Sequence, residues 1–245
     1  IVTGDWSSDV CSSDLVASLI KSLPNYEFIF AQAPKNNLWI QDPPDGKDTP
    51  TTDPKWADES ITYLDNLVSE HGSFSGILGV SQGAAFIPVY LANTSNKFDM
   101  ALMFNGYLPT THEGLMGSIN SAAPFKIPSI VFSGDKDTDF KDMAQALADK
   151  FSESVHIKSS VAGHHLPTDS DPTFTQILDF ISPPSIKVVL DGDTVKITIS
   201  DDSLKSVEAN KLAFYGVKSS DGSEVEINVT GVSGTYADGF SVAKS

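Results

Sequence analysis

The chain has 245 residues, 40% of them hydrophobic and 20% charged, and no stretch approaches the roughly 20 uninterrupted apolar residues that a membrane helix needs. It is acidic: 32 Asp and Glu stand against 16 basic residues, for a formal charge of −16, and every basic residue is Lys. An acidic surface repels phosphate, and a chain without Arg has no bidentate phosphate fork. The composition therefore disfavours nucleic-acid binding and tight binding of a polyphosphate cofactor.

The first residues do not follow any structural pattern. A common short-read sequencing adapter, translated in one frame, gives Asp5 to Leu15 residue for residue. We therefore interpret residues 1–15 as a non-native scar and leave them out of the prediction of the fold; a genuine Ser/Asp-rich loop is the alternative. Cys11, the only cysteine, lies in this stretch, so the chain can form no disulfide framework and no Cys-based zinc site. The lack of disulfides fits a reducing compartment, and we expect a cytoplasmic protein.

From Val16 onward, strand and helix patterns alternate. Apolar runs predict strands over 26–34, 76–80, 99–104, 128–134 and 154–159. Helical spacing predicts helices over 16–23, 57–70, 83–92, 139–152 and 172–181. The Pro/Asp/Thr-rich segment 36–56 and the segment 105–127 are predicted to be loops. Strands that alternate with helices indicate a mostly parallel sheet flanked by helices, here an α/β domain over 16–182.

The pattern changes at Pro183-Pro184. Two strand-like runs around Asp191-Gly192-Asp193 predict a hairpin, and a similar pattern follows over 211–231. No helical period occurs there, so we predict a small, separate all-β module over 185–245. The module is short for a complete β-sandwich, so we expect it to be truncated. Its sequence does not indicate a binding partner.

Residues 79–83, Gly-Val-Ser-Gln-Gly, match the G-x-S-x-G nucleophile elbow between a predicted strand and a predicted helix. In that turn the serine oxygen projects from the edge of the sheet, and the two glycines avoid collisions with the neighbouring strand and helix. The backbone N–H of Gln82, at the positive end of the helix, then faces the attacked carbonyl as an oxyanion donor. A plain turn is the alternative interpretation.

A serine nucleophile needs a base and an orienting acid, and in this fold they follow in the order Asp, then His. Asp135, Asp137 and Asp139 follow one predicted strand, and His164 and His165 follow the next. An acid at such a junction can instead cap the following helix, and Asp139 is well placed for that. The alternating acids also suggest a calcium loop, but Phe140 stands where that loop requires glycine, so we predict no metal site.

These motifs together resemble the FSH family of serine hydrolases, which are small α/β-hydrolases. The likeness rests on "GVSQGAA" (79–85), "ALMFNGYLP" (101–109), "SGDKD" (133–137) and "GHHLP" (163–167), with "FAQAP" (30–34) in the second strand, and it covers about 16–182. The resemblance implies Ser81 as nucleophile, Asp137 as acid and His164 as base, with His165 only a neighbour. It implies hydrolysis of short- to medium-chain carboxylic esters without a cofactor. Acyl-protein thioesterases carry a similar elbow, so a thioester remains an alternative substrate.

One feature departs from the family pattern. A family member has a first strand and a His-Gly loop that supplies the second oxyanion N–H, and here the adapter-like residues occupy that position. We therefore expect the first strand to be missing and the activity of this chain to be impaired, since loss of one oxyanion donor costs on the order of 10²–10³ in turnover. A non-catalytic, hydrolase-like binding protein is the rival from another functional class.

Three aromatic residues are candidates for the wall of the acyl pocket. Trp39 and Trp56 lie in the predicted loop 36–56, and Tyr107 lies in the segment after the strand that ends at 104. In the alternative interpretation, both tryptophans belong to the hydrophobic core.

Overall fold

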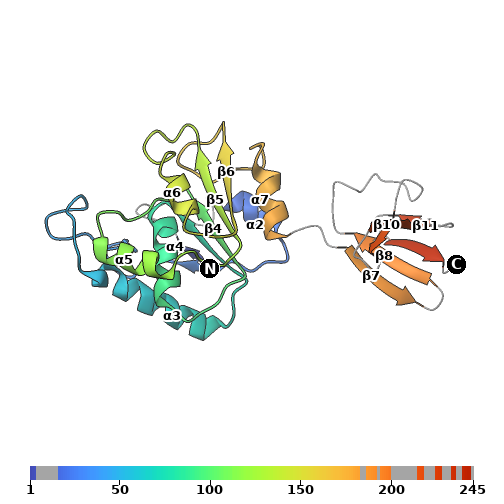
Figure 1. The fold of residues 1–245 in the computed structure, drawn as a ribbon, viewed down its shortest axis with the longest axis horizontal. Coiled ribbons are helices and arrows are strands. Elements are labelled where there is room, and N and C mark those ends of the chain that lie inside the picture. The colour runs from blue at the N-terminus through green and yellow to red at the C-terminus, as the bar shows by residue number, and fades with distance from the viewer. Residues whose placement is uncertain are drawn as a thin grey trace. The chain divides into compact units, whose positions relative to one another are not determined.

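The computed structural model describes residues 1–3 and 16–182 with their side chains, and after them the backbones of six strands that lie between residues 186 and 243. It divides into two compact units, Ile1–Ile181 and Ser182–Ser245 (Figure 1). The described part contains no helix long and apolar enough to cross a membrane.

The first unit is built on a six-stranded sheet in the order β2-β1-β3-β4-β5-β6, and every neighbouring pair is parallel. The strands are β1 (Val2–Thr3), β2 (Phe30–Ala31), β3 (Gly76–Val80), β4 (Met100–Phe104), β5 (Ser129–Gly134) and β6 (Ser154–Ser159). The α/β-hydrolase-like, mostly parallel sheet predicted from the sequence is confirmed. Parallel strands bring their carboxyl ends to one edge, so the turns after β3, β4, β5 and β6 meet there.

Helices cover both faces of this sheet (Figure 1). They are α2 (Ala17–Ser22), the 3-10 turn η1 (Pro54–Ala57), α3 (Asp58–His71), α4 (Gln82–Asn93), α5 (Glu113–Ala122), α6 (Ala144–Ala148) and α7 (Phe174–Ile181). Alternate residues of β3 enter two separate cores, because side chains of a strand point to opposite faces. Ile77 belongs to the core that also contains buried residues of α3, α4, α5 and α6, whereas Leu78 belongs to the core with α2 and α7. The sheet is thus buried on both faces, as a parallel sheet requires.

The expectation of a missing first strand needs a correction. Val2 and Thr3 form β1 in the interior of the sheet, where Val2 is in register with Phe30 on one side and Leu78 on the other. The adapter match begins only at Asp5, but the whole stretch from residue 1 was excluded from the prediction. Ile1 and Val2 are apolar and buried, which is the property that places them in the sheet.

The prediction of a loop over 105–127 was wrong, because this segment contains the ten-residue helix α5. Gly114 and Gly117 weaken its local helical signal, since glycine is among the poorest helix formers. Leu115 and Ile119 lie one turn apart and are both buried, so packing on the sheet stabilises the helix.

The second unit contains only strands among its described residues. These are β7 (Ile186–Asp191), β8 (Thr194–Ile199), β9 (Phe214–Val217), β10 (Glu224–Ile227), β11 (Ser233–Thr235) and β12 (Gly239–Ala243). β7 and β8 pair antiparallel as the predicted hairpin, within a four-stranded sheet in the order β11-β12-β8-β7. β9 and β10 form a separate antiparallel pair.

Candidate active site

Ser81 lies in a strained turn between β3 and α4. Its φ of 54° and ψ of −120° fall outside the regions that residues with a Cβ ordinarily adopt, which is the conformation of a nucleophile elbow. The following helix α4 is buried from Gly83 to Tyr90, so the core holds the turn in place. Strain of this kind persists only where the surrounding structure enforces it, and it directs the hydroxyl away from the sheet.

Gly79 permits the close approach of strand and helix at this turn. A Cβ on Gly79 would lie 2.5 Å from the carbonyl oxygen of Gly83 and 2.6 Å from the nitrogen of Ala84. Both are backbone atoms, so neither can turn aside as a side chain would. The glycine two residues before the serine is therefore required by packing, as expected from the motif.

Substitution of this glycine provides a test of the elbow. We expect Gly79→Ala to lower the free energy of unfolding by at least about 1–3 kcal/mol, the usual cost of overpacking, and to reduce the yield of folded protein. The measurement is the urea midpoint of the variant and the parent. Gly117→Ala is the matched control, because a Cβ at Gly117 meets nothing within 4 Å and the residue lies in helix α5. Equal midpoints for Gly79→Ala and the parent would contradict the close approach.

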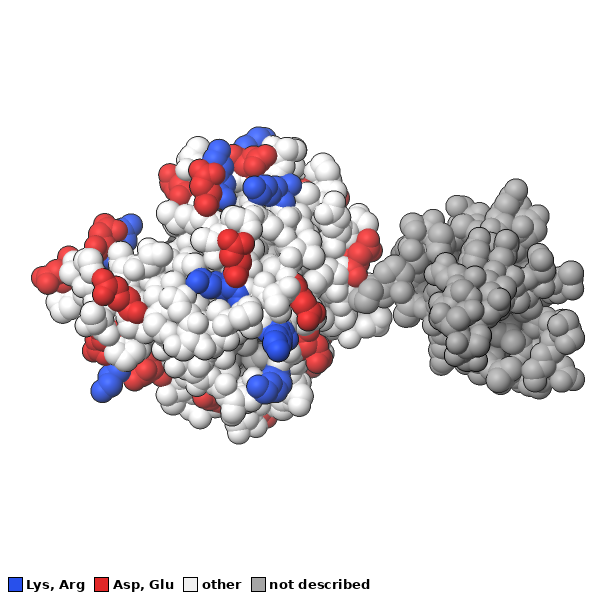
Figure 2. Space-filling model, in the orientation of Figure 1, with Lys and Arg blue, Asp and Glu red and all other residues white. Residues whose placement is uncertain are grey.

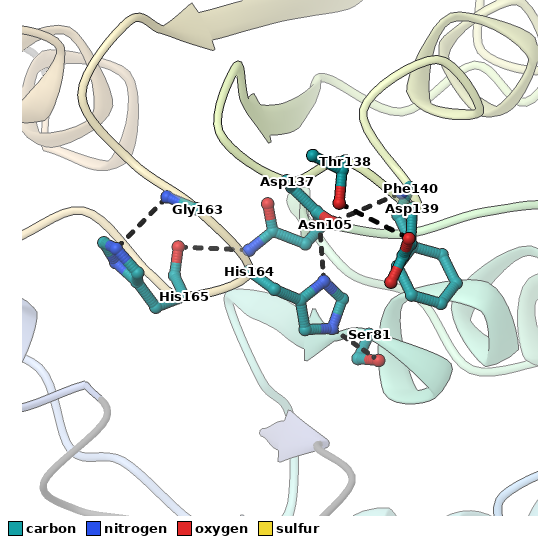
Figure 3. A network of polar contacts seen from close by, with 9 residues as sticks. All are labelled: Ser81, Asn105, Asp137, Thr138, Asp139, Phe140, Gly163, His164 and His165. Atoms are coloured by element: carbon teal, nitrogen blue, oxygen red, sulfur yellow. Dashed lines mark hydrogen bonds and ion pairs between the residues drawn. The ribbon is translucent and has the colours of Figure 1, made fainter.

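Three side chains from different turns meet at the carboxyl edge of the sheet (Figure 3). The Nε2 atom of His164 lies 3.0 Å from the Ser81 hydroxyl, and its Nδ1 atom lies 2.7 Å from the carboxylate of Asp137. Asp137 is 5% exposed, whereas 38% of the His164 side chain is exposed. The serine is thus linked through the imidazole to a buried carboxylate, and the histidine faces the open side of the site.

The hydrogen bonds assign the histidine tautomer. A carboxylate can only accept, so His164 donates its Nδ1–H to Asp137 and leaves Nε2 free to accept from the serine hydroxyl. The other Asp137 oxygen accepts from the backbone N–H of Phe140 at 3.2 Å. This arrangement equips Nε2 to take a proton from Ser81, with the carboxylate beside it to stabilise the resulting cation.

The loop that carries His164 is fixed on both sides of that residue (Figure 3). The Gly163 N–H donates to Nε2 of His165 at 3.2 Å, and the side chain of Asn105 donates to the His165 carbonyl at 3.0 Å. Asn105 follows β4, is 1% exposed and has a left-handed φ of 50°. Asn105 is not among the residues predicted from the sequence. Its signal there is an Asn-Gly pair directly after a buried strand, a pair that tolerates left-handed backbone.

A buried acid, Asp171, anchors the same loop where it begins and ends. Asp171 accepts from the hydroxyls of Ser159 at 2.6 Å and Thr173 at 2.7 Å. Burial alone raises the pKa of Asp171, but these hydrogen bonds and the Thr173 N–H lower it below its usual value. The Ser159 hydroxyl also accepts from the N–H of Ala162, two residues before His164. The loop is therefore anchored to the end of β6 and to the start of α7.

Comparison with known proteins identifies the family. The family model described as Serine hydrolase (FSH1) matches residues 20–175, well over half of the chain. The chain belongs to this family. It is 29% identical over 149 residues to Esterase FUS5 of Gibberella fujikuroi and 31% identical over 149 residues to Esterase FUS5 of Gibberella moniliformis. Each of these matches covers 60% of the chain, and the chain spans 61% of the length of each relative.

Solved structures agree on the fold of this FSH1-family chain. A carboxylesterase from Mesorhizobium loti superimposes with a TM-score of 0.50 over 75% of this chain and 87% of that one, and esterase PE8 with a TM-score of 0.53 over 72% and 89%. Both are 16% identical to this chain, so the likeness concerns the α/β-hydrolase fold alone.

Gln82 contributes two groups to this FSH1-family site, its backbone N–H and its side chain. Its backbone N–H lies in the first turn of α4, where N–H groups have no partner within the helix and the helix dipole is positive. Its side chain accepts from the backbone N–H of Trp39 at 2.7 Å and donates to the Ile40 carbonyl at 3.2 Å. The residue after the nucleophile thus fixes the segment around 39–40 against α4, a role the sequence analysis did not include.

The three aromatic candidates for the pocket wall differ in their positions. Trp39 is completely buried and stacks on Phe86 at 5.2 Å, so the expectation that it lines a pocket is replaced by a place in the core. Trp56 is half-buried, packs against the same core and donates its indole N–H to Thr51. Tyr107 lies nearest the site, because its ring contacts Phe140, whose ring in turn contacts His164.

The predicted defect in the oxyanion loop lies outside the described residues, since it falls on 4–15. The last described residue before this segment, Thr3, has its hydroxyl 3.1 Å from the Leu78 carbonyl and 3.4 Å from the Gly83 carbonyl. The carboxyl end of β1 therefore lies beside the first turn of α4. Among the described residues there is also no group of three or more His, Cys, Asp or Glu arranged to hold a metal ion.

Proposed function

We propose that this chain hydrolyses carboxylic esters of short- to medium-chain acids, with Ser81 as nucleophile, His164 as general base and Asp137 as the acid that orients the base. The observation that carries the proposal is the continuous line of contacts from the Ser81 hydroxyl through the imidazole to a buried carboxylate. These residues are separated by 83 and 27 positions along the chain, and their convergence at the end of β3 supports a catalytic role over a plain turn. The Esterase FUS5 relatives support an ester as substrate.

The reaction proceeds in two halves. His164 Nε2 takes the proton of the Ser81 hydroxyl while the oxygen attacks the ester carbonyl carbon, and the carbonyl becomes an oxyanion. When this intermediate collapses, the bond to the alcohol oxygen breaks and Nε2 gives that oxygen its proton. The alcohol leaves and an acyl ester on Ser81 remains. A water molecule then gives a proton to Nε2 and attacks the same carbon, and the acid leaves as Ser81 regains its proton.

The Gln82 N–H stabilises the oxyanion in both halves. A donor aimed at the site where negative charge develops is typically worth 10²–10³ in turnover. The Gln82 side chain holds two backbone groups of 39–40, so its own backbone is fixed before the substrate arrives. A donor whose position is fixed in advance costs no reorganisation of its own at the moment of attack, which is the condition under which it is most effective.

Turnover and covalent labelling together test this proposal. The chain should hydrolyse p-nitrophenyl acetate and butyrate, and a serine-directed fluorophosphonate should label a single peptide that contains Ser81. The same assay with a thioester of the same acid decides between the ester and thioester interpretations. Absence of both turnover and labelling would favour the non-catalytic binding protein.

We further propose that the adapter-like segment limits the rate. Exchange of residues 4–15 for a His-Gly loop of the family type should raise kcat for p-nitrophenyl acetate by about 10²–10³, because a second oxyanion N–H would be added. The comparison is made between this chain and the exchanged chain at equal folded concentration. Equal kcat values would show that the segment costs no transition-state stabilisation.

A further inference from the structure

Next to the proposed base lies an aromatic surface that the mechanism above does not use. The Phe140 ring centroid is 4.8 Å from that of the His164 imidazole, and the Tyr107 ring centroid is 5.4 Å from that of Phe140. Phe140 and Tyr107 are both half-buried, so neither residue is completely enclosed by the core. We refer to these two side chains as the aromatic shelf.

The shelf is attached rigidly to the reacting groups. The Phe140 N–H donates to Asp137, the carboxylate that holds His164. Tyr107 lies three residues after the end of β4, in the segment that begins with the buried Asn105. Gly106, between them, is packed so closely that a Cβ there would lie 2.7 Å from the Ala84 side chain. The rings therefore keep a fixed position relative to the imidazole, which lowers the entropic cost of binding a rigid group.

Geometry relates the shelf to one half of the substrate. The alcohol oxygen must come within hydrogen-bond distance of His164 Nε2 to receive its proton, because Nδ1 is occupied by Asp137. The atoms bonded to that oxygen must then lie beside the imidazole, whose ring centroid is 4.8 Å from that of Phe140. The acyl carbon, by contrast, is bonded to Ser81 and its oxygen faces the Gln82 N–H.

The charged residues around the shelf limit the kinds of alcohol that can bind there. The segment 135–142 contains four Asp and two Lys, and Asp135, Asp139 and Asp142 are exposed. Acidic and basic side chains are interspersed over the face drawn in Figure 2 without a continuous basic area. An anionic alcohol would be repelled by the acids next to Phe140, whereas an aromatic ring would gain a ring–ring contact in addition to burial of apolar area.

We propose that Phe140 and Tyr107 form the alcohol subsite of this enzyme and select esters whose alcohol carries an uncharged aromatic ring, an inference that rests on the esterase function proposed above. Such a ring stacks on Phe140 while its oxygen exchanges a proton with His164. The same subsite also serves acyl transfer to an alcohol. An aromatic alcohol bound there can attack the acyl-enzyme in place of water. In that step the alcohol proton passes to Nε2, the alcohol oxygen bonds to the acyl carbon, and the bond to Ser81 breaks as Ser81 takes the proton.

Competition between alcohols for the acyl-enzyme tests the subsite. p-Nitrophenyl acetate supplies the acyl group, equal concentrations of benzyl alcohol and ethanol compete for it, and the ratio of benzyl acetate to ethyl acetate is measured. The parent should give an excess of benzyl acetate. Phe140→Leu should lower the ratio by about 3- to 10-fold, the range expected for loss of one aromatic contact, and Tyr107→Leu should lower it by a smaller factor. Leucine at 140 retains the backbone N–H that Asp137 accepts.

The product ratio separates this inference from other effects, because a general loss of activity lowers both products equally. The matched control is Phe151→Leu, which removes one ring of the Phe125–Phe151 pair at 5.1 Å, beside the amino ends of β5 and β6. Its ratio should equal that of the parent. If Phe140→Leu does not fold, Tyr107→Leu decides the question alone. Hydrolysis by the parent with the same ratio in both shelf variants would overturn the alcohol subsite and leave the esterase proposal intact. A parent with no turnover would overturn both.

Discussion

Replacement of Ser81 by alanine is expected to lower kcat/KM for p-nitrophenyl acetate by at least about 10⁴-fold and to abolish fluorophosphonate labelling. Removal of a serine nucleophile eliminates the covalent path, and in a well-studied serine protease it costs on the order of 10⁶ in kcat. The residual rate then reflects only the oxyanion donor and substrate binding. The folded structure should be preserved, because alanine requires no more space than serine and the hydroxyl bonds only to His164 among the described side chains.

A second serine in the same domain provides the matched control for this experiment. Ser133 has its hydroxyl 3.0 Å from Nε2 of His156, the same distance and atom type as the contact between Ser81 and His164. It is 2% exposed, however, and the other ring nitrogen of His156 faces the amide oxygen of Gln145 instead of a carboxylate. Ser133→Ala should therefore retain labelling and turnover. Labelling that survives Ser81→Ala, or is lost in Ser133→Ala, would contradict the assignment of Ser81.

The parts of the fold that the sequence predicts well are those in which local pattern and packing agree. The strand over 76–80 and the helix after it begin and end within a residue or two of β3 and α4, because an apolar run, two glycines and a run of small residues all specify the same turn. That Ser81, the acids at 135–139 and the histidines at 164–165 follow neighbouring strands could also be predicted, since parallel strands place the residues that follow them at a single edge. The choice of Asp137 and His164 among them came from the family resemblance. The distances between the three side chains could not be predicted, because they depend on loops anchored by distant groups such as Asn105 and Asp171.

The errors have a common physical cause, in that tertiary contacts override weak local signals. Gly114 weakens the prediction of a helix over 113–122, yet a Cβ at that position would lie 2.4 Å from the Thr52 carbonyl, a contact that the sequence does not reveal. The helix predicted over 139–152 is reduced to Ala144–Ala148. The residues before it turn around Asp137, whose side chain accepts from the Phe140 N–H and whose carbonyl accepts from the Lys141 N–H.

Phe140 illustrates how a residue next to the candidate site can be overlooked in the sequence. In the sequence it served only to exclude a calcium loop, since it occupies the place of a required glycine. Nothing in its neighbours along the chain indicates a contact with His164, which lies 24 residues later and on the turn after another strand. Residues that touch a reacting group through space are found from the arrangement of the strands, and aromatic residues on loops at the carboxyl edge are the positions to search.

Replacement of Asp137 by asparagine is expected to lower kcat by about 10⁴-fold while leaving KM and the stability of the fold nearly unchanged, because the side chain keeps its size and shape. The Phe140 N–H already fixes which atom of the new amide points where: it donates to one oxygen of Asp137, so the amide oxygen will occupy that place. The amide nitrogen then faces Nδ1 of His164, at the position now 2.7 Å away. Because an amide nitrogen only donates, Nδ1 must become the acceptor and the ring proton moves to Nε2. The imidazole can then no longer take the proton of Ser81.

The neighbouring acids make this prediction specific. Asp135 and Asp139 are exposed and belong to the same short segment, so Asp135→Asn and Asp139→Asn change the net charge by the same amount without reaching His164. Both should keep kcat within a few-fold of the parent, whereas Asp137→Asn loses it. Steady-state kinetics of the three variants with p-nitrophenyl acetate provide the comparison, and proton NMR adds an independent readout. The downfield resonance of the His164 Nδ1–H, expected in the parent from its bond to a carboxylate, should disappear only in Asp137→Asn. A full rate in Asp137→Asn would mean that the bond between Asp137 and His164 is not needed for catalysis. An equal loss in all three variants would mean that the rate depends on negative charge near the site and not on that bond.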